Sequence, residues 1–297
     1  MTDFPLWADM LYNTPIAIDR FKNDVFCQVA EARILGEKPS KIDVASLHTV
    51  QARSDDATYA SDSGRKPFLH RGSIAVVPVR GTLMHRASFM DAESGLVGYN
   101  GLLKTMRAAS RDSDIKAIFM PFDSGGGACS GMLACAEEIA TMSKAEGGKP
   151  IYAYLDDRAC SAAYVLASAA DRILGRRETM AGSLAAILNM VDKSKAYEKV
   201  GLKPVVVRAS WADLKAKGQP GEVIDESLIA SAQAMVDSIS AMMVEFISAM
   251  RGISEKQIKD LRGEAFLAEE AMGYGLIDDI ASEDEAWAML EAEIARV

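Results

Sequence analysis

The segment at 149–187 constrains the fold of this chain more than any other part of its sequence. It opens with a run of branched and aromatic residues at 151–155, which predicts a buried strand. A turn of small residues follows at 159–163, and apolar residues at 164–169 then predict a buried helix. Ser161 is therefore expected where a strand gives way to a helix.

A serine at this junction has two interpretations. The free backbone N–H groups and the dipole at a helix N-terminus favour developing negative charge, which suits a nucleophilic hydroxyl and an oxyanion hole in acyl transfer. The alternative is a helix of small residues packed in a core, with Ser161 as an ordinary cap. Both interpretations fit the segment taken alone.

Composition limits the class of protein. A chain of 297 residues can bury a sizeable core, and its net charge of −9 argues against non-specific nucleic-acid binding. The first fifteen residues lack the basic head and apolar block of a signal peptide, and the uncharged run at 179–191 is shorter than the roughly 20 residues of a membrane span. We therefore expect an intracellular protein without a membrane span. Four scattered cysteines without a C-x-x-C pair predict free thiols and no zinc site: Cys27, Cys129, Cys135 and Cys160.

Strand and helix patterns alternate from residue 74 onward, which predicts an α/β fold with largely parallel strands. We expect an N-terminal helical arm and linker at 1–70, with one amphipathic helix over 16–35, then a main domain at 71–280 and a C-terminal helix at 281–297. The predicted strands are 74–79, 117–122, 151–155, 173–174 and 205–207, and the predicted helices are 101–109, 132–142, 193–200, 228–250 and 267–272.

Two further segments are candidates for chemistry. The glycine-rich turn DSGGG at 123–127 directly follows a buried strand, and consecutive glycines let a backbone present its N–H groups closely to a ligand. It lacks the Gly-Lys-Ser/Thr ending of a nucleotide-binding loop. The charged segment at 213–220 carries Lys215 and Lys217, although a lysine beside such a turn is usually solvated. The three histidines, His48, His70 and His85, lie outside these segments, so the base for a nucleophilic Ser161 would be a lysine.

The order of these segments is specific. SGGG at 124–127, KPIYAYLDDRACSAAYVLASAADRI at 149–173, MAGSLAAI at 180–187 and DLKAKGQP at 213–220 together strongly resemble the signal peptide peptidase A superfamily. Its phage branch, the head-maturation proteases also called minor capsid protein C, is the nearest match. The resemblance covers about residues 72–280 and implies the Clp/crotonase fold, a spiral of repeated ββα units.

The resemblance implies a serine endopeptidase with a Ser/Lys dyad and no metal or cofactor. Ser161 matches the nucleophile, Lys215 the general base, and Ser183 the serine that orients the lysine amine. The oxyanion hole would use backbone N–H groups of three candidates: Ala162, Gly126 and Gly127. A lysine amine with an ordinary pKa near 10.4 is protonated at neutral pH, so burial would have to lower that pKa by roughly three units.

The chain departs from the family pattern at two positions, and a second lysine leaves a choice of register. Gly125 replaces the usual proline of the glycine-rich loop, which leaves open which glycine supplies the oxyanion donor. Leu214 replaces the histidine that often precedes the dyad lysine, and Lys217 lies only two residues beyond Lys215. Lys215 is preferred because Gly218 and Pro220 then fall where the phage proteins have them.

The resemblance also implies biological context. It predicts processing of capsid, portal or scaffold proteins inside an assembling phage head, in the cytoplasm of a bacterial host, by a homo-oligomeric ring whose neighbouring subunits complete each site. A pocket for small or medium apolar side chains is expected beside the nucleophile, since the wall there is built from Ala159, Cys160, Ala162 and Ala163. Two alternatives remain: a crotonase-type acyl-CoA enzyme, and a non-catalytic head-assembly protein with the same fold.

Overall fold

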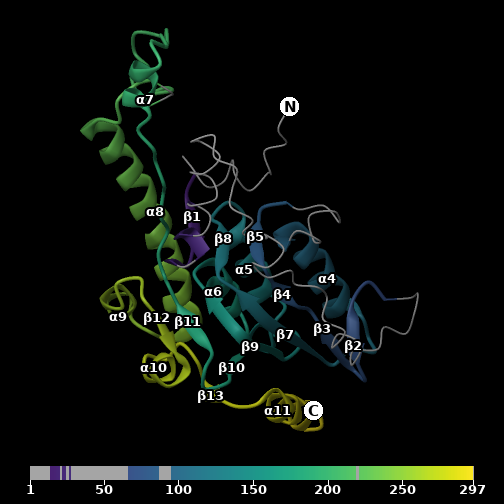
Figure 1. Ribbon diagram of the computed structural model, residues 1–297. Helices are drawn as coiled ribbons and strands as arrows, with labels where there is room; N and C mark the ends of the chain where they lie inside the picture. Colours follow the sequence, from purple (N-terminus) through teal and green to yellow (C-terminus); the bar gives the residue numbers. More distant parts are fainter. Residues whose placement is uncertain are drawn as a thin grey trace.

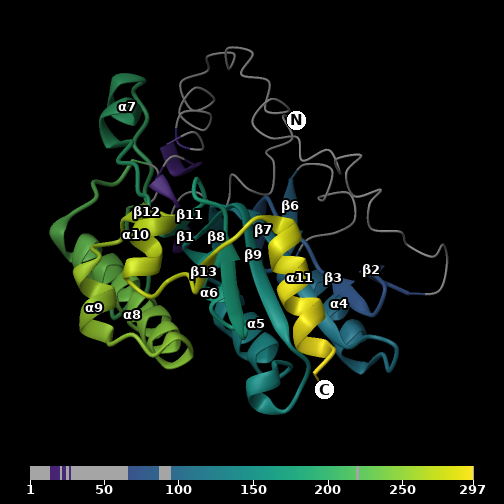
Figure 2. The same ribbon diagram turned by 90° about the horizontal axis from the view of Figure 1, so that it is seen from below.

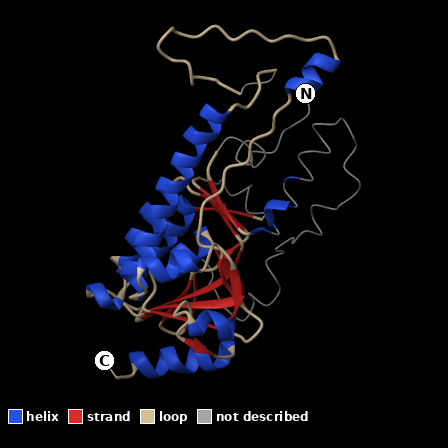
Figure 3. Ribbon diagram, turned by 90° about the vertical axis from the view of Figure 1, so that its left-hand side faces the viewer, coloured by secondary structure: helices blue, strands red, loops and turns tan. Residues whose placement is uncertain are grey.

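The computed structural model describes residues 14–20, 22–24, 27, 66–86, 95–218 and 221–296. Within them the strands form a nine-stranded sheet and a four-stranded sheet, which Figure 3 shows as two separate groups. The centre of the larger sheet is β9 (Ile151–Cys160), which pairs in parallel with β7 (Ala117–Ser124). The other strands of this sheet are β2 (Leu69–Arg71), β3 (Ile74–Val76), β4 (Val79–Arg80), β10 (Arg172–Gly175), β11 (Met180–Gly182), β12 (Ala265–Leu267) and β13 (Asp279–Ile280).

Helices cover both faces of the larger sheet, which explains why β7 and β9 are buried along almost their whole length. On one face lies α11 (Glu283–Ile294), which crosses β7 and β9 (Figure 2). There Trp287 stacks on Phe119 with ring centroids 4.4 Å apart. The other helices with described bounds are α4 (Tyr99–Arg111), α5 (Met132–Ala140), α6 (Ala162–Ala167), α7 (Ser194–Lys199), α8 (Glu226–Arg251), α9 (Glu255–Asp260) and α10 (Ala268–Gly273), with a 3-10 turn at Lys144–Glu146. Residues 20, 22–24 and 27 are also helical.

The smaller sheet has the order β1 (Ile16–Ile18), β8 (Gly126–Ala128), β5 (Thr82–Met84) and β6 (Leu96–Gly98). A pattern recurs along the chain: a strand in the larger sheet, a strand in the smaller sheet, then a helix. β7, β8 and α5 form one such unit, and β4, β5, β6 and α4 form another. The predicted α/β fold with repeated ββα units and largely parallel strands is therefore confirmed.

The C-terminal helices extend to one side of the sheets. The 26-residue α8 packs its C-terminal half on the core through Met243, Val244 and Ile247, while its N-terminal half projects with α7 beyond the sheets (Figure 1). Within the described residues, α8 is by length and composition apolar enough to cross a membrane. The contacts of its C-terminal half are those of a helix packed on a protein core.

Three predicted elements differ from the structure. Residues 16–18 form strand β1 rather than the start of a helix, because they pair with β8. Residues 20, 22–24 and 27 are helical as predicted, and the predicted helical residues 21, 25, 26 and 28–35 lie outside the described ones. Residues 205–207 are not a strand, since they are exposed and no neighbouring strand pairs with them in the described part of the chain. The predicted glycine-rich turn contains strand β8.

Candidate active site

Ser161 lies between the end of β9 at Cys160 and the start of α6 at Ala162. Its backbone has φ 56° and ψ −120°, a positive φ that a residue with a side chain rarely adopts and that costs on the order of 1–3 kcal/mol. The Ser161 N–H donates to the Gly182 carbonyl at 2.7 Å, which holds this conformation. A strained serine between a strand and a helix is also how the nucleophile of a hydrolase elbow is presented.

β11 brings Ser183 level with Ser161. The parallel register pairs Gly182 with Cys160, so Ser183 and Ser161 are the residues that immediately follow this pair. Ser183 also has a positive φ, 58°, and its N–H donates to the Glu264 carbonyl at 2.7 Å. The Ser161 hydroxyl donates to the carbonyl of Ala185, just beyond Ser183, at 3.3 Å.

The glycine-rich strand β8 passes beside the same junction. A Cβ built on Gly126 would lie 3.1 Å from the Ala162 amide nitrogen and 3.0 Å from the Cys160 carbonyl oxygen. A Cβ on Gly127 would instead meet the Leu83 carbonyl oxygen of β5 at 2.0 Å. Gly126 is therefore the glycine that faces the Ser161 turn. Its N–H donates to the Ser124 hydroxyl at 3.2 Å, a long contact.

The neighbouring thiol is not a competing nucleophile. Cys160 is buried, and burial raises the pKa of its thiol to about 12. Because the thiolate is the reactive form, the thiol is inert at neutral pH. The hydroxyl of Ser161 is thus the reactive group that this turn presents.

A charged cluster that sequence patterns did not reveal lies beside the glycine-rich loop. The buried Asp19 carboxylate is 3.7 Å from the guanidinium of Arg158 and accepts the backbone N–H of Lys22 at 3.0 Å. Burial lowers the pKa of Lys22 to about 8, against the opposing attraction of Asp19. Arg158 is far from Asp19 and Lys22 in sequence, so no local spacing predicts the cluster, and the pairing of β1 with β8 brings the two segments together.

Within one chain, Lys215 is remote from this site. It lies in the exposed segment between α7 and α8, where the Arg208 guanidinium donates to its carbonyl at 2.6 Å. That segment is fastened to the first turn of α8 by the ion pair of Lys217 and Asp225 at 2.7 Å. Farther along α8, the Ser240 hydroxyl accepts the Ala186 N–H, which lies close to the Ser161 turn. At a rise of 1.5 Å per residue, the 14 residues from Glu226 to Ser240 span about 21 Å of α8, and this length separates the Lys215 segment from the Ser161 turn.

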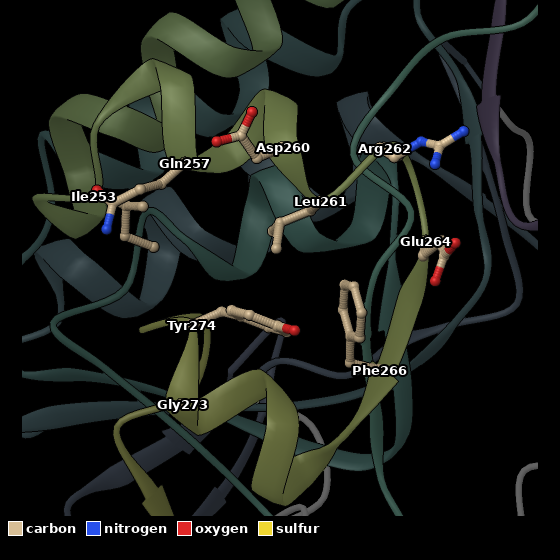
Figure 4. Close-up of a pocket in the computed structure, with 9 residues that line it drawn as sticks. All are labelled: Ile253, Gln257, Asp260, Leu261, Arg262, Glu264, Phe266, Gly273 and Tyr274. Atoms are coloured by element: carbon tan, nitrogen blue, oxygen red, sulfur yellow. The ribbon is translucent and has the colours of Figure 1, made fainter.

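A separate pocket of about 420 Å³ lies among α9, β12 and α10 (Figure 4). The aromatic rings of Phe266 and Tyr274 meet edge to face inside it, with centroids 4.8 Å apart. Ser161 does not line this pocket. The pocket is connected to the serine junction through Glu264, which lines the pocket and whose carbonyl accepts the Ser183 N–H. The lining residues are Ile253, Gln257, Asp260, Leu261, Arg262, Glu264, Phe266, Gly273 and Tyr274.

Known proteins with similar sequences include two from phages. Capsid assembly protease C of Escherichia phage lambda is 27% identical over 290 residues, which are 96% of this chain and 65% of that protein. Head-tail preconnector protein GP5 of Enterobacteria phage P21 is 28% identical over 213 residues, 72% of this chain and 42% of that protein. Protease 4 of Haemophilus influenzae is 26% identical over 215 residues, 72% and 33% of the two chains. This chain therefore spans less than two thirds of the length of each relative.

Similar solved structures include an enoyl-CoA hydratase/isomerase from Marinobacter aquaeolei, with a TM-score of 0.46 and 12% identity over 76% of this chain and 74% of that one. A membrane-bound stomatin-specific protease in complex with a substrate peptide has a TM-score of 0.41 and 15% identity, covering 73% and 80%. At these scores the likeness supports no further conclusion.

The segment that contains Ser161, Ser183 and Lys215 also matches a known family. The sequence model of that family, Peptidase family S49, matches residues 143–296, which is more than half of the chain. With phage and bacterial proteases among its sequence relatives, this chain belongs to peptidase family S49.

Proposed function

We propose that this protein is a serine endopeptidase in which Ser161 is the nucleophile and Lys215 the general base. The observation that carries the proposal is the strained, fully buried Ser161 at the end of β9. The amide of the next residue, Ala162, lies beside the glycine-rich strand at Gly126. These two amides are the oxyanion donors we propose, and Ser183 is the residue we propose to orient the lysine amine.

We propose that Lys215 comes from a neighbouring subunit. The segment between α7 and α8 carries apolar side chains that one chain leaves uncovered: Val205, Val207 and Trp211 are 77%, 91% and 85% exposed. Packing this segment on a second copy would bury those side chains and the Lys215 stem together. Burial is also what lowers a lysine pKa enough for the amine to accept a proton at neutral pH. One contact between copies would therefore both cover the exposed apolar side chains and bury the catalytic lysine.

The structure supports Lys215 over Lys217 as the base. The Lys217 ammonium donates to Ser227 at 2.6 Å and is paired with Asp225 at 2.7 Å, so its charge is needed to fasten the segment to α8. An amine already engaged in these contacts is not free to reach the Ser161 hydroxyl. The exposed Lys215 side chain has no such role in holding the segment.

Similarity to the phage proteins guides the proposed substrate and location. We propose that the enzyme cleaves capsid, portal or scaffold proteins within a phage procapsid. This rests on the names of the lambda and P21 relatives, capsid assembly protease and head-tail preconnector protein. The peptidase unit that we propose spans 71–280, with β1 and α11 packed against it.

One experiment tests the dyad and its division between subunits. Ser161→Ala and Lys215→Ala should each abolish casein hydrolysis, because one removes the nucleophile and the other leaves it unactivated. Co-expressed in equal amounts, the two inactive variants should recover about a quarter of wild-type activity, since random mixing in a closed ring pairs an intact serine with an intact neighbouring lysine at that frequency.

Ser168→Ala is the matched control, because Ser168 is buried at the end of the same helix and its hydroxyl donates to the nearby Val165 carbonyl at 2.8 Å. It should keep normal activity. No recovery in the mixture would show that the base is supplied within one chain. Undiminished hydrolysis by Ser161→Ala would refute the peptidase assignment, as would failure of the wild type both to hydrolyse casein and to react with a fluorophosphonate probe.

A further inference from the structure

The chain's own strand β1 lies between the edge of β8 and Ile187, and we call this strand-binding position the groove. On one side β1 pairs antiparallel with the glycine-rich β8, with Ala17 opposite Gly127 and Ile18 opposite Gly126. On the other side Ile16 exchanges two backbone hydrogen bonds with Ile187, at 2.9 and 2.8 Å. This three-residue strand therefore has backbone partners along both edges.

Both edges belong to the active site. β8 carries the glycine that faces the Ser161 turn, and Ile187 lies two residues after Ala185, whose carbonyl accepts the Ser161 hydroxyl. An extended peptide held by backbone pairing on a strand edge is a general mode of peptide recognition. Main-chain bonds supply the affinity and pockets for alternate side chains supply the selectivity, so β1 is bound as a peptide substrate would be.

The register singles out one peptide bond. The Ala17 carbonyl oxygen and the Ala162 amide nitrogen lie 2.2 and 3.1 Å from the same point, the position that a Cβ on Gly126 would occupy. Among the carbonyls of β1, the one that approaches the same point as the Ala162 amide is the one that this amide, our proposed oxyanion donor, would polarise. In this register that carbonyl belongs to the bond between Ala17 and Ile18.

The side chains on either side of this bond fit the groove. Ala17 is fully buried within the main core, in the same cluster as Ala162 and Leu184. Ile16 and Ile18 are also buried but belong to a different cluster, with Ile187. This division follows from the alternation of side chains along a strand. The residue just before this bond is therefore a buried, small apolar one, and we expect a substrate to carry the same kind of side chain at that position.

The residues after the bond are anchored as well. The Asp19 N–H donates to the Gly125 carbonyl at 2.8 Å, and its buried carboxylate faces the Arg158 guanidinium. Since Arg158 lies on β9 three residues before Ser161, these contacts hold the chain on the far side of the bond. The bond is therefore fixed from both directions.

We propose that the peptide bond between Ala17 and Ile18 is a self-cleavage site, an inference that rests on the proposed peptidase function. The Ser161 oxygen attacks the Ala17 carbonyl carbon while its proton passes to the Lys215 amine. The C–N bond then breaks, the Ile18 nitrogen takes that proton, and Ala17 is left as an ester on Ser161. One water molecule hydrolyses the ester. The fragment that ends at Ala17 leaves, and the groove opens to protein substrates.

Intact-mass measurement and N-terminal sequencing of the purified full chain test this proposal. Wild-type protein should begin at Ile18, whereas Ser161→Ala should keep the residues before it. Ala17→Arg should also stay uncleaved, because the buried Ala17 site cannot hold a charged side chain. Thr14→Arg is the matched control: Thr14 is exposed, so this variant should be cleaved like the wild type.

The outcomes separate this inference from the proposed function. Wild-type protein that hydrolyses casein yet keeps its residues before Ile18 overturns self-cleavage alone, and so does cleavage at another bond or normal processing of Ala17→Arg. Wild-type protein that neither hydrolyses casein nor cleaves itself overturns both. Processing of the wild type at Ile18, with an intact Ala17→Arg variant whose urea unfolding is as cooperative as that of Ser161→Ala, supports the proposal, and the unfolding curve excludes misfolding of that variant.

Discussion

At the scale of single residues, the site depends on backbone conformations that side chains ordinarily avoid. Ser161 and Ser183 both have positive φ angles near 57°, on neighbouring strands of one sheet. Hydrogen bonds from their amides, to Gly182 and Glu264, hold these angles. Such strain persists only where surrounding contacts hold the backbone in place. At Ser161 the positive φ breaks the extended backbone of β9, so its side chain does not continue the alternation of that strand.

Gly126→Ala is the residue-scale prediction. Gly126 has φ +99°, and an added Cβ would lie 2.2 Å from the Ala17 carbonyl oxygen and 3.1 Å from the Ala162 nitrogen. The backbone must then move apart, so casein hydrolysis should be lost and the free energy of unfolding should fall by about 1–3 kcal/mol. Urea unfolding and an activity assay measure the two effects.

Gly147→Ala is the control for that prediction. Gly147 has a similar φ of +84°, but an added Cβ would meet nothing within 4 Å. This variant should lose comparable stability and keep its activity. Equal activity in the two variants would mean that the close approach of Gly126 to the Ser161 turn plays no part in catalysis.

At the scale of elements, the attachment of the Lys215 segment to α8 rests on Asp225. The Asp225 carboxylate caps α8 by accepting the Leu228 N–H at 3.0 Å and is paired with Lys217. The Lys217 ammonium and then the Leu228 amide lower the pKa of Asp225 to about 2. Because the folded pKa is depressed, the attachment is complete above the ordinary pKa of 3.8 and is lost as the pH falls through about 2.

Asp225→Ala should therefore loosen the start of α8 together with the segment at 208–222. Hydrogen exchange should speed up in both, and peptidase activity should drop if the segment carries the catalytic lysine to a neighbour. Asp225→Asn keeps an oxygen for the cap and should have a smaller effect. Asp237→Ala, an exposed acid further along the same helix, is the control and should leave exchange in 208–222 unchanged.

At the scale of the whole molecule, α8 and the segment before it leave apolar surface uncovered. Only Met243, Val244 and Ile247 of α8 are buried, whereas Met235 and Met242 are 49% and 46% exposed. A closed ring covers every copy of such a surface, while an open arrangement would grow into filaments. This uncovered surface supports the proposed homo-oligomeric ring.

Met242→Glu should dissociate the ring and remove peptidase activity together, because a carboxylate buried without a partner at an interface costs several kcal/mol. Light scattering and casein hydrolysis on the same sample report both effects. Met242 is a sharper choice than Phe246, which already packs against the core of its own chain. Met289→Glu is the control, since Met289 is 36% exposed on α11, away from α8. A monomeric wild type with full activity at micromolar concentration would contradict the ring.

The sequence alone determined the local features of this protein. Hydrophobic periodicity predicted β7, β9, α5, α6 and α8 near their observed positions, because local patterns decide which segments form buried strands or amphipathic helices. It also placed Ser161 at the junction of a strand and a helix. The order of the motifs identified the family that residues 143–296 match.

Tertiary structure decided what depends on distant partners. Residues 16–18 begin a segment with helical periodicity, 16–35. They nevertheless form a strand, because β8 and Ile187 offer backbone partners on both sides. Residues 205–207 have the composition of a strand and form none, because no described strand lies beside them. The cluster of Asp19, Lys22 and Arg158 arises in the same way. Backbone pairing between remote segments leaves no local spacing in a sequence, so the occupied groove beside Ser161 became visible only in the folded chain.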